Sequence, residues 1–140
     1  MEINDVKYLI VHKSHTPDDE DIGVEELDRI HRLNGAIKIR HHYIIRKNGE
    51  EEKGRLVTER GIHTEEYNKE SISLCLIGDK NFTAAQLKTL RKKLKHLRTI
   101  FHKAKIIGHQ DLVGERDNCP GFDVRDWYGL KDDSEITIKG

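Results

Sequence analysis

Apolar residues in this chain fall into short runs separated by polar turns, and the spacing within each run predicts a strand or a helix. Short β-branched runs predict strands in "KYLIVHKS", which ends near His12, in "HHYII", in "SISLCLIGD" and in "KIIGH". The segment "HHYIIRKNGEEEKGR" predicts a hairpin, because Asn48-Gly49 can supply the positive φ angles of a tight turn.

Other segments carry the three-to-four-residue spacing of helices. The segment "GVEELDRIHRLNG" predicts a helix with Gly35 as its C-terminal cap. One face of this helix would contain Val24, Leu27, Ile30 and either His31 or Leu33. The short segment "DVRDWYG" predicts a helix near the C-terminus.

The clearest helix begins at Thr83, which forms a capping box with Gln86, while Phe82 can pack as a staple onto Leu87. A buried stripe then follows at Leu87, Leu90, Leu94, Leu97 and Phe101. Strands mixed with helices of this length predict an α/β fold with a sheet covered by helices. A chain of 140 residues fits a single domain, 1–140.

Composition narrows the function classes. The 25 basic and 25 acidic side chains balance, which argues against nucleic acid or a membrane surface as the main partner. The basic run "KTLRKKLKHLRTIFHKAK" is read first as a solvated helix face. No stretch has the pattern of a signal peptide or a membrane span, so we expect synthesis in the cytoplasm. Two cysteines give no disulfide framework, and Cys75 is expected to be a core thiol in its strand.

Three candidate metal ligands follow from the predicted strands. His12 closes the first strand, His109 closes the "KIIGH" strand, and Cys119 follows a polar loop. Catalytic zinc takes three ligands from the His, Cys and carboxylate set and leaves one position open, and these residues would satisfy that requirement. Each alone is more often a surface or core residue than a ligand.

The motifs taken together resemble one family. "YLIVHKSHT", "HRLNG", "HHYIIRKNGEEEKGR", "GIHTEEYNKESISLCLIG", "IIGHQDL" and "NCPGFDV" occur in the order and approximate spacing of the type-two N-acetylmuramoyl-L-alanine amidases. That group includes bacteriophage lysozyme-type amidases and peptidoglycan recognition proteins. The resemblance covers about residues 7–127, with 130–140 as a C-terminal tail, and implies a central mixed β-sheet flanked by helices.

The resemblance also implies a chemistry. Members cleave the amide between N-acetylmuramic acid and L-alanine in peptidoglycan, and His12, His109 and Cys119 match their zinc ligands. His63 matches a segment that borders the substrate cleft, and Tyr67-Asn68 match a pair expected to be structural first. The protein is accordingly expected to be a Zn²⁺-dependent, monomeric, endolysin-like hydrolase that acts on the cell wall after release.

The helper residues depart from the family pattern. Where phage enzymes carry a tyrosine this chain has His41, and where they carry a lysine two residues before the cysteine it has Asp117. His41 could act as general base on the zinc water, or as an imidazolium donor to the oxyanion and leaving group. Asp117 could orient His41 or accept the water proton, and Arg116, expected to contact substrate, could supply positive charge in place of the lysine. His42 alternates away from His41 and is expected to be structural.

Two other readings remain open from the sequence. Changed helpers could mark a non-catalytic module that binds muropeptide, although such modules usually lose the cysteine ligand that Cys119 represents here. Alternatively, the basic helix face around Arg91 to Lys95 could bind a regulatory partner such as a polymerase.

Overall fold

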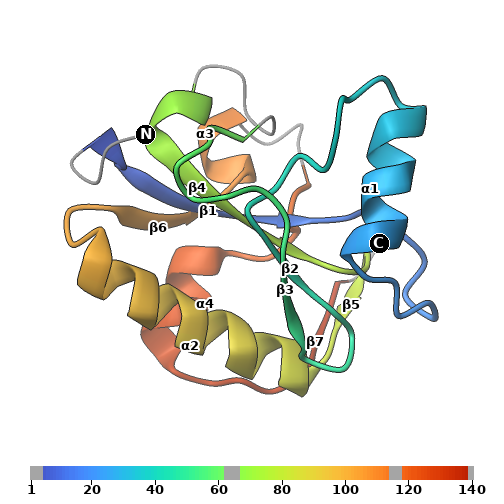
Figure 1. Ribbon diagram of the computed structural model, residues 1–140. Helices are drawn as coiled ribbons and strands as arrows, with labels where there is room; N and C mark the ends of the chain where they lie inside the picture. Colours follow the sequence, from blue (N-terminus) through green and yellow to red (C-terminus); the bar gives the residue numbers. More distant parts are fainter. Residues whose placement is uncertain (1–4, 62–66, 114–117, 139–140) are drawn as a thin grey trace.

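The computed structural model describes residues 5–61, 67–113 and 118–138 (Figure 1). Its central sheet has the strand order β3-β2-β4-β1-β6. The strands are β1 (Tyr8–Lys13), β2 (Tyr43–Ile45), β3 (Glu51–Lys53), β4 (Ser71–Leu76) and β6 (Lys105–Gly108). Strands β2, β4, β1 and β6 are parallel, and β3 pairs antiparallel with β2. The predicted mixed sheet flanked by helices is therefore confirmed.

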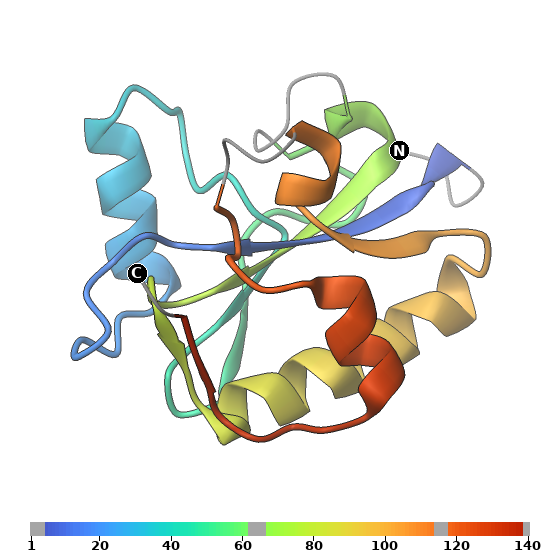
Figure 2. The ribbon, with the colours of Figure 1, turned by 180° about the vertical axis from the view of Figure 1, so that it is seen from behind.

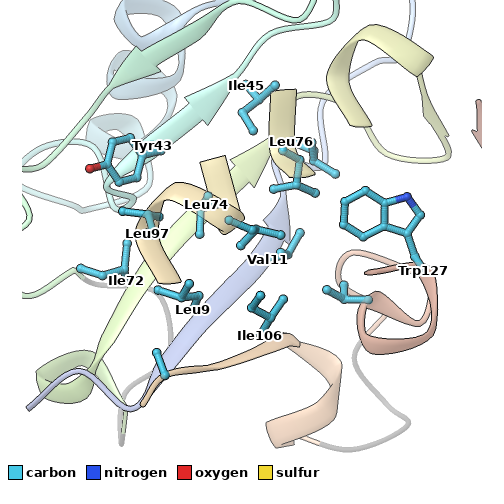
Figure 3. Close-up of a cluster of buried hydrophobic side chains, with 14 of the residues drawn as sticks. Leu9, Val11, Tyr43, Ile45, Ile72, Leu74, Leu76, Leu97, Ile106 and Trp127 are labelled. Carbon is cyan, nitrogen blue, oxygen red and sulfur yellow. The ribbon is translucent and has the colours of Figure 1, made fainter. Parts of the chain in front are cut away.

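Helices cover the two faces of this sheet unequally. Helices α2 (Ala84–Ile100) and α4 (Val124–Leu130) pack on one face, and α1 (Val24–Leu33) packs on the other (Figures 1 and 2). Alternate strand residues on the α2 face form the larger apolar cluster, which Figure 3 shows around Leu9, Val11, Leu74, Leu76 and Trp127. The α1 face holds a smaller cluster of Leu27, Ile39, Ile44, Cys75 and Ile77.

Helix α2 follows its sequence pattern. Thr83 Oγ1 accepts from the Gln86 backbone N–H at 3.1 Å, and Gln86 Oε1 accepts from the Thr83 N–H at 2.9 Å, so the predicted capping box is present. The stripe from Leu87 to Phe101 is buried as predicted. Burying each such leucine contributes about 1.5–3 kcal/mol, which makes α2 the main apolar cover of the sheet.

The predicted hairpin also forms, but its turn differs from the expectation. Gly49 takes a φ of 90°, whereas Asn48 keeps a negative φ and its Oδ1 accepts from the Glu50 N–H at 2.9 Å. The hydrogen bond from Arg46 N–H to Glu50 O closes the connection, which is therefore longer than a two-residue turn.

Helix α1 is the less buried helix. Leu27 is its one fully buried residue, and Leu33 is 78% exposed, so the stripe does not extend to Leu33. Gly35, with a φ of 93°, follows the helix end as predicted.

Several short elements had no sequence prediction. Besides the 3₁₀ helix η2 (Asn68–Glu70) they are α3 (Gln110–Val113), β5 (Asn81–Phe82) and β7 (Ile136–Thr137). Strands β5 and β7 pair antiparallel in a second small sheet, so part of the expected tail is a strand. Among the described residues, no helix combines the length and apolar character needed to cross a membrane.

Arg91 lies inside the molecule rather than on the basic face expected around it. It is 7% exposed, its Nε donates to Asp133 Oδ1 at 2.7 Å, and its guanidinium lies 4.4 Å from the ring centroid of Trp127. Arg91 thus ties α2 to α4 and to the segment before β7, and it is not available to a partner.

Candidate metal centre

Three potential metal ligands from distant parts of the chain meet above the α1 face of the sheet. One ligand atom from each of His12, His109 and Cys119 lies within 4.8 Å of the other two. His12 and Cys119 are buried and His109 is partly exposed. The structure therefore brings together the three residues that the sequence singled out.

The strands set the positions of the two histidines. His12 lies in β1 opposite Cys75 of β4, with its side chain on the α1 face. His109 directly follows β6, and its N–H donates to Val11 O at 3.1 Å. Because β1 and β6 are parallel neighbours, the two imidazole centroids come to 4.5 Å from each other.

Hydrogen bonds hold the loop that carries Cys119. Gln110 N–H donates to Cys119 O at 2.8 Å, and Gln110 Oε1 accepts from Gly121 N–H at 2.9 Å. The Lys13 N–H points at Cys119 Sγ over 3.3 Å, a contact that favours the thiolate. A Cβ on Gly108 would lie 3.0 Å from Pro120 Cδ, so a larger residue there would have to displace the loop by a few tenths of an ångström.

The donor set and spacing fit zinc. Nitrogen and sulfur ligands 2.1 and 2.3 Å from a tetrahedral zinc lie about 3.6 Å apart. His12 Nδ1 and Cys119 Sγ are 3.7 Å apart. Three ligands of the His and Cys type leave a fourth position open, which is the arrangement of catalytic rather than structural sites.

His41 lies beside this cluster. Its ring centroid is 4.8 Å from that of His12, and its Nδ1 is 2.5 Å from Ser73 Oγ on β4. His41 is 7% exposed, so its orientation is fixed by these neighbours rather than by solvent. Its catalytic role stays a prediction, and the structure places its ring next to a candidate ligand.

His42 is held away from the cluster. Its Nδ1 accepts from the Ser73 N–H at 3.0 Å, so its Nε2–H donates to Glu59 O, 2.6 Å away. Burial lowers the pKa of His42, partly offset by the hydrogen bond to Glu59. The neutral ring joins β4 to the 54–61 segment, a structural role as predicted.

His31 and Ser73 are residues near the cluster that the sequence did not single out for chemistry. The ring centroid of His31, in the last turn of α1, is 5.6 Å from that of His41, and its Nδ1 accepts from the Arg40 N–H at 3.0 Å. Burial and the charge of Arg40 lower the pKa of His31 to about 4, against an opposing effect of Asp28. The polar Ser71 and Ser73, alternating within an apolar strand, were the available signal for Ser73.

Cys75 is the other thiol near the cluster. It is fully buried in β4, and burial, with a further contribution from the charge of Cys119, raises the pKa of its thiol well above the usual value. The interpretation of Cys75 as a core residue is confirmed.

The segment after His12 is anchored to the loop after β4. The buried Lys13 Nζ pairs with Asp79 Oδ1 at 3.1 Å. Burial opposes ionisation of Asp18, but hydrogen bonds from the Asp79, Asn81 and Lys80 N–H groups and from Lys47 hold its pKa well below the usual value. These contacts make the end of β1 a fixed support for the cluster.

The remaining predicted site residues fall elsewhere. Asp117, Arg116 and His63 lie outside the described residues. The ring of Tyr67 packs edge-on against Tyr8 with centroids 5.6 Å apart, which is the structural role expected for it.

The fold and the ligand cluster define an α/β protein with a candidate His-His-Cys metal centre on one sheet face. Residues 2–122 match the family model for N-acetylmuramoyl-L-alanine amidase, and the chain belongs to that family. It is 34% identical over 128 residues to the endolysin of Klebsiella phage KP32, a match that covers 86% of this chain and 83% of the endolysin.

Two solved structures share the fold. N-acetylmuramoyl-L-alanine amidase LysC from Clostridium intestinale URNW is 21% identical with a TM-score of 0.79, covering 93% of this chain and 87% of LysC. A Drosophila PGRP-LB variant in complex with tracheal cytotoxin is 20% identical with a TM-score of 0.74, covering 96% of this chain and 84% of that chain.

Proposed function

We propose that this protein is a zinc-dependent amidase that cleaves the bond between N-acetylmuramic acid and L-alanine in peptidoglycan. The observation that carries the proposal is the convergence of His12, His109 and Cys119 within 4.8 Å in a chain of the amidase family. Bound there, zinc would supply an activated water and a Lewis acid for the amide carbonyl.

The protein side chains have separate tasks in this proposal. His12, His109 and Cys119 hold the metal, and His41 acts on the reacting groups from beside His12. Asp117 orients or assists His41, while Arg116 and His63 contact substrate. The buried thiol of Cys75 remains protonated and takes no part.

The similar proteins support a proposal for where the protein acts and which class of ligand it binds. The match to a phage endolysin supports action on the cell wall after release from the cytoplasm. The PGRP-LB variant is in complex with tracheal cytotoxin, which supports a muropeptide as the ligand class. We propose a monomer whose substrate is peptidoglycan rather than nucleic acid or a membrane.

The decisive experiment compares two thiol deletions. Wild type, Cys119→Ala and Cys75→Ala are analysed for zinc and then incubated with purified peptidoglycan, with and without a chelator. We expect wild type and Cys75→Ala to release stem peptides with a new L-alanine amine, identified by mass, and the chelator to stop this release. Cys119→Ala should lose zinc and activity together.

Other results would contradict the proposal in distinct ways. Release that persists in Cys119→Ala or in chelator would remove the metal from the reaction. Stoichiometric zinc and peptidoglycan binding without cleavage would instead make the protein a muropeptide-binding module.

A further inference from the structure

Ser73 places a hydroxyl group against His41, whose ring lies beside His12 of the ligand cluster. Its side chain is fully buried in β4, and its Oγ lies 2.5 Å from His41 Nδ1. We propose that Ser73 is a positioning residue that holds neutral His41 in the Nε2–H tautomer, so that His41 acts as a hydrogen-bond donor rather than as a general base. This inference deepens, and rests on, the proposed amidase function.

Hydrogen-bond accounting gives the direction of the bond. A serine hydroxyl has one hydrogen to donate, and among the described residues the hydrogen-bond partner of Ser73 Oγ is His41 Nδ1. If Nδ1 carried the proton, the buried hydroxyl hydrogen would lose its acceptor there, at a cost of about 1–3 kcal/mol. The hydroxyl therefore donates to Nδ1, and the imidazole proton is on Nε2.

The backbone of Ser73 fixes this geometry. Its N–H donates to His42 Nδ1 at 3.0 Å, and its carbonyl accepts from the His42 N–H at 3.1 Å. His42 also donates to Glu59 O, so hydrogen bonds to both β4 and Glu59 hold the segment that carries His41. Ser73 thus has its Oγ held at a constant place relative to the His41 ring.

The same pattern recurs at the neighbouring histidines. His31 accepts at Nδ1 from the Arg40 N–H, and His42 accepts at Nδ1 from the Ser73 N–H. In each neutral ring the proton is then on Nε2. His41 differs because its Nδ1 partner is a side chain, so this hydrogen bond can be removed by substitution.

The tautomer decides what His41 can do. With Nδ1 occupied by the Ser73 hydroxyl and Nε2 protonated, the ring has no free lone pair to accept a proton. The donor of the ring would then be its Nε2–H, in a side chain whose ring centroid lies 4.8 Å from that of His12. Such a donor stabilises negative charge on the carbonyl oxygen as the amide is attacked. It replaces the hydroxyl donor that a tyrosine provides at this position in the family pattern.

The first test reads the tautomer directly. Long-range proton–nitrogen NMR of the zinc-loaded, ¹⁵N-histidine-labelled protein distinguishes Nδ1–H from Nε2–H, and comparison with His41→Ala assigns the signals. We expect Nε2–H in wild type and in the control Ser71→Ala, which removes a buried hydroxyl from the same strand. Ser73→Ala should shift His41 to a tautomer mixture. A wild-type His41 with Nδ1–H would overturn the inference, whatever the activity.

The second test uses kinetics in a double-mutant cycle. Ser73→Ala should lower kcat about 10-fold with KM unchanged, as expected for loss of one interaction that acts in the transition state. Ser73→Ala should have no further effect in a His41→Ala background. An equal loss in that background would show that Ser73 acts through folding and overturn its role through His41.

The two proposals fail separately. A wild type that shows Nε2–H but releases no stem peptide would overturn the amidase function and the donor role, while Ser73 would still set the tautomer. An active wild type with Nδ1–H would leave the amidase function intact and overturn only the role of Ser73.

Discussion

The adjacent residues His41 and His42, which directly precede β2, have different surroundings in this protein. His41 is turned towards His12 and Ser73 Oγ, whereas His42 is fixed between the Ser73 N–H and Glu59 O. Strand alternation predicted that only one of the two faces the metal site, and the family resemblance predicted that His42 is the structural one. The alternating serines of "SISLCLIG" indicated a polar side of the strand, but the sequence does not show which residue Ser73 contacts.

Substitution of His41 tests whether this residue acts in catalysis or in metal binding. His41 is not among the three ligands, so His41→Ala should keep the wild-type zinc content. We expect kcat to fall by about 100-fold, the usual effect of losing one donor to developing charge. Metal analysis and stem-peptide release measure the two quantities, with His96→Ala on the exposed side of α2 as control. Parallel loss of zinc and activity would show that His41 supports the metal instead.

Among the helices and strands, those with local sequence signals could be predicted, whereas pairings between distant segments could not. Helix α2 and the β2–β3 hairpin carry their signals within a few residues, the capping box at Thr83 and the glycine at Gly49. The β5–β7 pair joins Asn81 to Thr137 across most of the C-terminal half, and two-residue strands have no periodicity to detect. The hydrogen bond from Arg91 to Asp133 also joins residues far apart in the sequence, so no local pattern predicted it.

The capping box allows an element-scale test. Thr83 Oγ1 accepts from the Gln86 N–H and donates to Lys47 O at 2.7 Å, so it joins the start of α2 to the hairpin loop. Thr83→Ala should cost about 1 kcal/mol, or about 3–5 °C in Tm for a domain of this size. Thr83→Ser keeps the hydroxyl and should melt close to wild type. A thermal melt in which both variants lose the same stability would assign the effect to the methyl group.

For the whole molecule, the partly buried His31 and the buried His42 link stability to pH. The folded pKa of His31 is about 4 against 6.5 in an unfolded chain, so the unfolded state binds the proton first as pH falls. Stability is therefore full above about pH 6.5 and declines as pH falls towards 4. His42, whose pKa burial also lowers, contributes in the same direction.

Thermal melts at pH 7.5 and pH 5, with chelator present, measure this decline. The variant His31→Asn keeps an acceptor for the Arg40 N–H and removes the titrating group. We expect it to lose less Tm than wild type between the two pH values. An identical loss in both proteins would place the acid sensitivity at other groups.

The sheet also separates the larger apolar cluster from the candidate metal ligands. The apolar cluster under α2 and α4 lies on one face, and the ligand cluster with His41 and Ser73 lies on the other. Side chains on one face therefore pack in a different cluster from those on the other. Natural selection can thus exchange helper residues around the metal, such as a histidine for the tyrosine of the family pattern, without first passing through unstable ancestors. The fold would persist through such exchanges while the chemistry diversifies.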